Sequence, residues 1–270
     1  MALTLKTVEP RAGVRWVRDG FVQFARRPLA FTALFVVFLF TAMVMALVPV
    51  VGGLLQMMML PLLSLGFMIA TQSALLDGRV QPLQFLEPLR GDPVRRRSLV
   101  QLCILYGLGA VAILLLCDFL SDNAMQRLQQ LMARDDSSPA KVDALLSEPG
   151  VTSAVLVGLG LGTLLSIPFW HAPALVYWGG QRVGHALFSS TLAVWRSKGA
   201  FMLYGLAWTL IVLGFGLATA LLAGVLGARQ LGTLLAVPAG LLFSTVFYVS
   251  LLFTFNDSFG GGPAALKDVP

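Results

Sequence analysis

The sequence predicts an all-α, polytopic membrane protein with six transmembrane helices. Hydrophobic residues make up 57% of the 270-residue chain and charged residues only 12%, whereas about a quarter of an ordinary soluble domain is charged. A helix needs about 20 mostly apolar residues to cross a bilayer, and six stretches of the chain reach that length. The third observation is that most Lys and Arg residues fall in the connecting segments that would lie on one side of the membrane.

The six predicted spans occupy more than half of the chain. In order, they are Pro28 to Val51, Gly53 to Leu76, Leu99 to Leu120, Val151 to Trp178, Ala200 to Leu226 and Leu231 to Phe255. We therefore expect a single integral membrane domain over residues 1–270. The 27 residues before the first span hold six basic residues, which is too long a segment for the charged end of a signal peptide. The first span is expected to remain as an anchor.

Lys and Arg residues fall mainly on one side of this topology. With the N-terminus inside, fifteen basic residues lie in segments 1–27, 77–98, 178–199 and 256–270, and four lie on the opposite side. Because basic residues favour the cytoplasmic side, we expect both termini in the cytoplasm and residues 121–150 in the periplasm. The formal net charge of +6 reflects this bias, and no basic patch typical of nucleic-acid binding is evident.

Two similar octapeptides, LGTLLSIP at 161–168 and LGTLLAVP at 231–238, suggest an internal repeat. Both lie in spans predicted to run inward, and every inward span holds a proline: Pro61, Pro168 and Pro238. The favoured interpretation is one unit used three times, over about 11–77, 81–183 and 184–257. The alternative is chance similarity in a chain rich in Leu and Gly.

Each unit is predicted to begin with a short amphipathic helix on the cytoplasmic surface. Apolar residues recur at helical spacing before each outward span, as in Leu83, Leu86 and Leu89 before the third span. Basic residues flank these stripes, as expected of helices that contact anionic headgroups. The residues expected at the membrane surface are Arg15, Arg18, Phe21, Phe24, Arg26, Arg27, Phe188, Trp195 and Arg196.

The repeat also predicts where the fourth span ends. Hydropathy ends it at Trp178, but the second and sixth spans continue about sixteen residues past their prolines. The same spacing after Pro168 extends the fourth helix to Gly184, with Arg182 near the headgroups. The two boundaries place His171 either about 10 Å or about 20 Å from the inner surface.

This layout resembles a family of six-helix inner-membrane proteins from beta-proteobacteria. More loosely, it is similar to the multi-pass membrane portion attached to some bacterial glycerophosphodiester phosphodiesterases. The resemblance covers most of the chain and is carried by FARRP at 24–28, by the prolines of the inward spans and by LFSSTLAVWR at 187–196. The catalytic portion of those phosphodiesterases has no counterpart here, so the resemblance implies a bacterial inner-membrane location and no activity.

Polar residues inside the predicted spans are the candidates for an intramembrane site. His171 is the one ionisable group deep in a span, and it lies between Pro168 and Pro173. A proton or substrate site is one interpretation, because ionisable groups in membranes are costly. The favoured one is a neutral histidine hydrogen-bonded to a neighbouring helix. Three amides complete the candidate set: Gln56, Gln72 and Gln101.

Other polar and small residues are interpreted as structural. Hydroxyls such as Ser64, Thr209 and Thr245 could line a cavity, and the favoured interpretation is that they hydrogen-bond between helices. Rows of small residues are expected to pack within the chain: Gly158 and Gly162, then Gly216, Ala220 and Gly224, then Gly232, Ala236 and Gly240.

The outer segment and the cysteines give no sign of metal or redox chemistry. Residues 121–150 are predicted to form a helical hairpin, and their acidic residues lack calcium-loop spacing. Cys103 and Cys117 lie about 21 Å apart along one predicted helix and cannot pair. No hydrolase, metalloprotease or phosphate-loop motif is present. We therefore expect no cofactor and no enzymatic activity.

The sequence supports three hypotheses about function. The first is a non-enzymatic component that binds the bilayer through anionic headgroups, or binds a membrane protein partner, in envelope organisation or complex assembly. The second is a small-molecule or lipid transporter, favoured by the repeat and its prolines. The third is an intramembrane enzyme, which depends on His171 alone. Oligomeric state cannot be read from the sequence.

Overall fold

The computed structural model describes residues 3–49, 51–124, 127, 130, 144–145, 147–227 and 231–260. All regular elements in these ranges are helical. Six helices are long and apolar enough to cross a membrane, which confirms the predicted fold class. The membrane-length helices are α2 (Pro28–Ala46), α3 (Gly52–Leu75), α5 (Pro93–Leu120), α8 (Pro149–Phe169), α11 (Lys198–Leu226) and α12 (Leu231–Phe259).

Shorter helices precede or interrupt these spans. They are α1 (Ala12–Arg26), the 3₁₀ turn η1 (Pro82–Phe85), α4 (Glu87–Arg90), α9 (Ala172–Tyr177) and α10 (Val183–Arg196). In chain order, one shorter helical segment precedes two spans within each of the three predicted units. The middle surface helix, however, is split into η1 and α4. Prolines at 82, 88 and 93 explain the split, because each favours a helix start and disfavours helix at the preceding residue.

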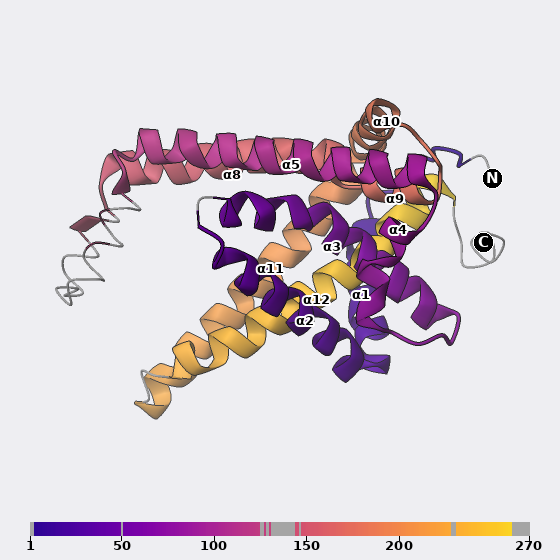
Figure 1. Cartoon of the computed structure of the whole chain (residues 1–270). Helices are drawn as coiled ribbons and strands as arrows, with labels where there is room; N and C mark the ends of the chain where they lie inside the picture. Colours follow the sequence, from indigo (N-terminus) through magenta and orange to yellow (C-terminus); the bar gives the residue numbers. More distant parts are fainter. Residues whose placement is uncertain are drawn as a thin grey trace.

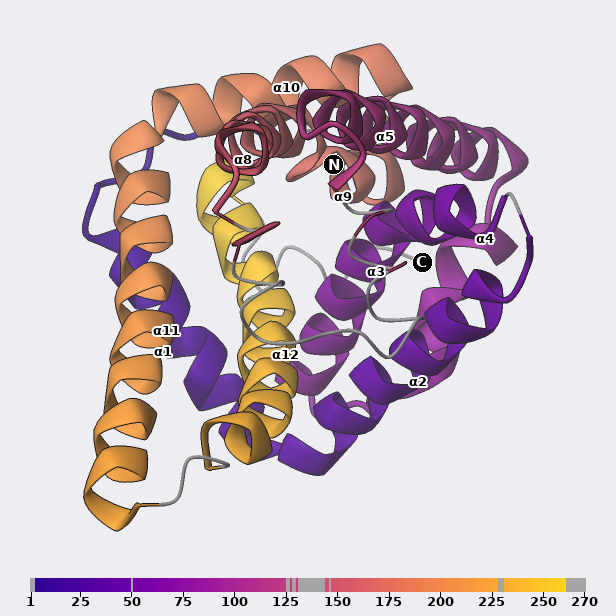
Figure 2. The same cartoon turned by 90° about the vertical axis from the view of Figure 1, so that its left-hand side faces the viewer.

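The spans are arranged in pairs, and α5 and α8 run side by side along one edge of the molecule (Figure 1). α11 and α12 form another pair, inclined to the first (Figures 1 and 2). α3 joins the two pairs by packing against both α5 and α12, and α2 packs against α3 and α12. α12 is central, because its C-terminal half joins both hydrophobic core clusters. Lys6 N donates to Ser258 O at 2.8 Å, so the two ends of the described chain lie at the same end of the bundle.

Local sequence explains where several helices begin and end. Pro28 occupies the first turn of α2, and Arg27 before it is non-helical, with φ −144° and ψ 56°. Asp92 caps α5 by accepting a hydrogen bond from Val94 N at 3.1 Å. At the other end of α5, Asp122 and Asn123 adopt positive φ angles, which ends the helix.

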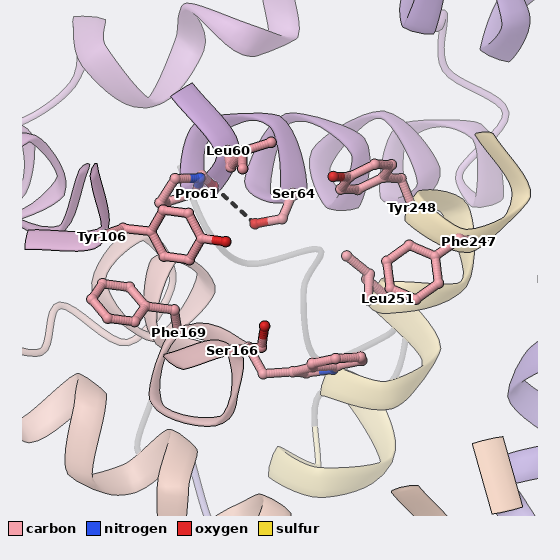
Figure 3. Close-up of a pocket in the computed structure, with 10 residues that line it drawn as sticks. Leu60, Pro61, Ser64, Tyr106, Ser166, Phe169, Phe247, Tyr248 and Leu251 are labelled. Atoms are coloured by element: carbon pink, nitrogen blue, oxygen red, sulfur yellow. Dashed lines mark hydrogen bonds between the residues drawn. The ribbon is translucent and has the colours of Figure 1, made fainter. Parts of the chain in front are cut away.

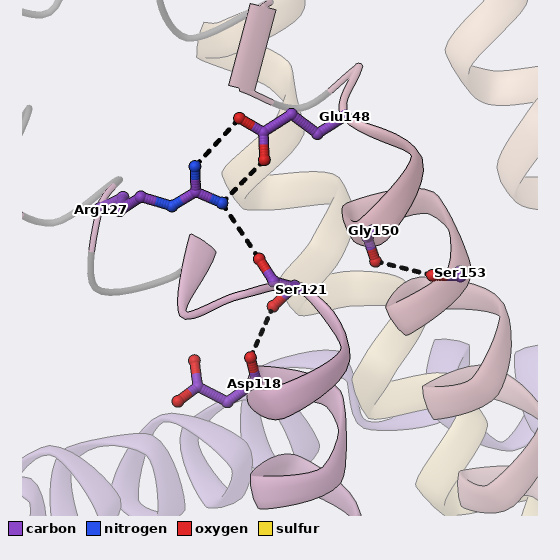
Figure 4. A network of polar contacts seen from close by, with 6 residues as sticks. All are labelled: Asp118, Ser121, Arg127, Glu148, Gly150 and Ser153. Atoms are coloured by element: carbon purple, nitrogen blue, oxygen red, sulfur yellow. Dashed lines mark hydrogen bonds and ion pairs between the residues drawn. The ribbon is translucent and has the colours of Figure 1, made fainter.

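A bidentate ion pair joins the C-terminal end of α5 to the N-terminal end of α8 (Figure 4). Arg127 donates from Nη1 and Nη2 to the two carboxylate oxygens of Glu148, at 3.0 and 2.7 Å. Arg127 Nη2 also donates to Ser121 O, at the C-terminal end of α5. Much of the hairpin predicted over residues 121–150 lies outside the described residues.

The fourth span ends earlier than the repeat predicts. The helix breaks at Trp170 and His171, resumes as α9, and ends at Tyr177. Gly180 has φ +60°, a backbone conformation that favours glycine, and α10 begins at Val183. The predicted extension to Gly184 is therefore wrong, and the hydropathy boundary near Trp178 is confirmed.

Candidate functional site

α10 presents an apolar face that the rest of the described protein leaves uncovered. It lies across the end of the α5 and α8 pair (Figures 1 and 2), and its inward face is buried around Ser190. Phe188 and Trp195 lie on the outward face, and each residue is 69% exposed. These two residues, with the half-buried Leu192 between them, form what we call the α10 stripe.

Basic side chains surround the α10 stripe. Arg182, Arg196 and Lys198 are all exposed. The Lys198 ammonium lies 5.6 Å from the centre of the Trp195 ring, which is a cation–π distance. The α10 stripe therefore has an apolar surface and positive charge side by side.

α1 is part of the bundle rather than a separate surface helix. It packs against α11 and α12, where Trp16 is fully buried and donates from Nε1 to Asp257 Oδ2 at 2.8 Å. Arg15 Nη2 donates to the same oxygen at 2.7 Å, and this bond raises the pKa of Arg15. Phe21 stacks on Trp208 with ring centres 5.8 Å apart.

The predicted surface residues of α1 thus divide into two groups. Phe24 is buried and Phe21 half-buried, so both face the bundle. Arg18 and Arg26 are exposed, whereas Arg27 donates to Gly78 O. Only the exposed arginines are available to headgroups.

His171 lies at the break between α8 and α9 with its side chain fully buried. Three phenylalanine rings surround the imidazole edge-on, with ring centres 5.5 to 5.9 Å away: Phe201, Phe255 and Phe259. Neither ring nitrogen has a hydrogen-bond partner among the described residues. The predicted hydrogen bond from this imidazole to a neighbouring helix is therefore wrong, and this part of the chain supplies no partner for a proton relay.

Ser190 makes the link between α10 and the broken helix. Its Oγ accepts from His171 N at 3.0 Å and donates to Ile167 O at 3.0 Å. Pro168 and Pro173 lack N–H groups, so they free backbone carbonyls near this break. One buried hydroxyl therefore satisfies a backbone donor and a backbone acceptor that the broken helix exposes.

The candidate amides do not form one site with His171. Gln56 and Gln72 lie sixteen residues apart on α3, which corresponds to about 24 Å along a helix. Gln56 Nε2 donates to Ala42 O of α2 at 2.7 Å, and Gln101 is exposed on α5. A single polar site made of these residues is thus ruled out by distance and exposure.

The structural interpretation of the hydroxyls and glycines also needs correction. The hydroxyls of Ser64, Thr209 and Thr245 donate to carbonyls of their own helices rather than between helices. Gly158 does approach another helix, because a Cβ there would lie 3.0 Å from Cys117 Sγ. No heavy atom lies within 4 Å of a Cβ built on the remaining row glycines: Gly162, Gly216, Gly224, Gly232 and Gly240. At those positions the prediction of packing within the chain is wrong.

A cavity of about 130 Å³ lies where α3, α5, α8 and α12 meet (Figure 3). We call it the four-helix cavity. The phenols of Tyr106 and Tyr248 and the hydroxyls of Ser64 and Ser166 project toward its interior. None of the described residues that line it is charged, and the other lining residues are Leu60, Pro61, Phe169, Trp170, Phe247 and Leu251.

The sequence offered a cavity only as the less favoured interpretation of hydroxyls such as Ser64, which does line this one, and it did not locate the cavity. Pro61 lines the cavity and Pro168 follows the lining residue Ser166 by two positions, so two inward-span prolines lie at or near its wall. The tyrosines gave no signal, because a Tyr in an apolar span has no spacing that marks a site. In the described ranges, no cluster of three or more His, Cys, Asp or Glu residues could hold a metal ion.

The six spans and the α10 stripe define a helical multi-pass integral membrane protein. The chain is 32% identical over 259 residues to a probable inner membrane protein of Burkholderia thailandensis, and the match covers 96% of this chain and 94% of that relative. The chain belongs to the same family as that protein, and it is a multi-pass inner-membrane protein. No family model and no solved structure matches the chain.

Proposed function

We propose that this protein is a non-enzymatic inner-membrane component that binds anionic lipid headgroups along α10. Through that surface it contributes to envelope organisation or to assembly of a membrane complex. The observation that supports this proposal is the α10 stripe, an exposed aromatic face bordered by Arg182, Arg196 and Lys198. The looser resemblance to phosphodiesterase membrane portions adds no activity to the proposal.

The physical argument combines apolar burial with charge. Burying an exposed side chain the size of Phe gains about 1.5 to 3 kcal/mol, so water is an unfavourable environment for Phe188 and Trp195. Each basic residue near an anionic surface adds about 1 kcal/mol. A helix with both features lies in the headgroup region. The bias of Lys and Arg assigns this surface to the cytoplasmic side in the proposal.

The test is the lipid that co-purifies with the protein in mild detergent, measured by mass spectrometry. One variant removes charge at the α10 stripe through Arg182→Gln, Arg196→Gln and Lys198→Gln. A matched control removes three exposed guanidinium groups near the start of α5: Arg90→Gln, Arg96→Gln and Arg97→Gln.

We expect the α10 variant to lose several-fold more anionic lipid than the control, at unchanged thermal stability. Equal lipid retention in both variants would contradict headgroup binding at α10. A stoichiometric protein that co-purifies with the wild type, and is lost only from the α10 variant, would assign the surface to a protein partner instead.

The four-helix cavity favours a second candidate function, a small-molecule or lipid transporter. A transporter exposes its central site to each side of the membrane in turn. Ser166→Cys, in a chain whose native cysteines are replaced by alanine, tests this directly. Labelling of residue 166 by water-soluble maleimides from both sides would favour transport, and protection from both sides favours the binding role.

A further inference from the structure

We propose that the four-helix cavity binds a neutral, planar ring that carries carbonyl oxygens and a lipid tail, which is the chemistry of a prenylated quinone. This goes beyond the role proposed for α10 and does not depend on it. The cavity lies between membrane-spanning helices, so its ligand must partition into the bilayer.

The phenol groups of the cavity are suited to a ligand that accepts hydrogen bonds. The phenol groups of Tyr106 and Tyr248 have no hydrogen-bond partner among the described residues, whereas the phenol of Tyr177 donates to Glu87 Oε1 at 2.9 Å. Ser64 and Ser166 donate to carbonyls of their own helices, at 2.9 and 2.8 Å. The free donors are therefore the two phenols, and carbonyl oxygens are the groups that satisfy them.

The charge of the lining excludes many membrane ligands. In the part of the chain that the structure describes, no Asp, Glu, Lys, Arg or His side chain lines the cavity. A phosphate or carboxylate headgroup would therefore be buried without a counter-ion, which is strongly unfavourable. An acyl chain alone avoids that cost but leaves both phenols unpaired. A neutral ring with carbonyl oxygens meets both requirements.

The size and the aromatic walls of the cavity suit one ring. Its volume of about 130 Å³ is close to that of an engineered cavity of about 150 Å³ that holds benzene. Phe169 and Tyr106 meet edge-to-face with ring centres 5.1 Å apart, and Trp170 and Phe247 do so at 6.0 Å. Aromatic walls favour a planar ring by stacking or edge contacts. The cavity is not enclosed, so a tail attached to the ring can leave it.

The experiment is photolabelling of the full-length protein in membranes with a photoreactive azido derivative of decylubiquinone. Mass spectrometry of the peptides locates the label. Two competitors are compared: decylubiquinone, and decylbenzene, which has the same tail on a ring without carbonyl groups. We expect label on peptides that contain residues 60–64, 106, 166–170 and 247–251. Decylubiquinone should compete at a concentration at least about tenfold lower than decylbenzene.

The variants Tyr106→Phe and Tyr248→Phe test the two phenols. Each should raise the half-competing concentration of decylubiquinone about two- to tenfold, the usual range for one neutral hydrogen bond, and leave that of decylbenzene unchanged. The decylbenzene value shows that the cavity remains intact in the variant. Tyr177→Phe, whose phenol lies outside the cavity, is the matched control and should change neither value.

Three results would overturn the proposal. The first is label that maps to other parts of the chain or resists competition. The second is equal competition by the two compounds, which would identify an acyl-chain cavity. The third is quinone competition that stays unchanged when both phenols are removed.

Discussion

Replacing Gly13 by Ala should loosen the contact between α1 and α11. The added Cβ would lie 2.1 Å from Ala200 O and 2.7 Å from Tyr204 N, and both atoms belong to the backbone of α11. Overpacking costs about 1 to 3 kcal/mol. Because a backbone cannot move aside as a flexible side chain does, we expect about 2 kcal/mol. That value corresponds to a factor of about 30 in the unfolding equilibrium.

Gly205→Ala is the matched control, because no heavy atom lies within 4 Å of a Cβ at that position of α11. Both glycines are helical, so the gain in helix propensity of about 1 kcal/mol cancels between the two variants. Thermal unfolding in detergent can be followed by the reaction of a thiol dye with Cys103, which is only 5% exposed. The midpoint for Gly13→Ala should fall about 4 to 8 °C below that of the control. Equal midpoints would refute the packing of α1 into the bundle.

Three further predictions concern the broken helix and the topology. Ser190→Ala should destabilise the protein by about 1 to 3 kcal/mol, because the buried His171 N loses its partner and Ile167 O keeps only the bond from Trp170 N at 3.4 Å; unchanged thermal stability would show that this hydroxyl is dispensable. A cysteine at position 171, in a background without other cysteines, should resist water-soluble maleimides from both sides, and rapid periplasmic labelling would instead reveal a water-filled path. Reporter fusions after Lys141 and at the C-terminus should report opposite sides of the membrane, and identical signals would contradict the predicted orientation.

Composition and hydropathy were sufficient to predict the six spans, because a chain that crosses a bilayer must bury its backbone polar groups in apolar helices. The end of the fourth span was not predictable from the repeat. Pro173 and Gly180 act locally, and the spacing of the second and sixth spans carries no information about them. For α1, the sequence left open whether Phe21 and Phe24 are buried toward the bilayer or toward the bundle. Its stripe showed that one face is buried, but a stripe does not say whether lipid or another helix covers that face.

Some residues of the candidate site could likewise be predicted from the sequence, and others could not. Phe188, Trp195 and Arg196 were predicted as a surface group, because they share one helix and its periodicity. Lys198, which begins α11, was not part of that prediction. Tyr106 and Tyr248 were not predicted, because they come from helices far apart in the sequence and meet only through packing. His171 was singled out by its chemistry, but its aromatic surroundings depend on Phe201, Phe255 and Phe259 from two other helices.

The most direct test of headgroup binding at α10 is the quenching of Trp195 fluorescence in proteoliposomes that contain anionic lipid. Trp195 is 69% exposed, whereas Trp16, Trp178 and Trp208 are 9% exposed or less, so the difference between wild type and Trp195→Phe isolates its signal. Lipids brominated near the headgroup should quench this difference signal strongly, and aqueous iodide should quench it weakly. Strong quenching by iodide with none by brominated lipid would contradict the insertion of α10 into the membrane surface.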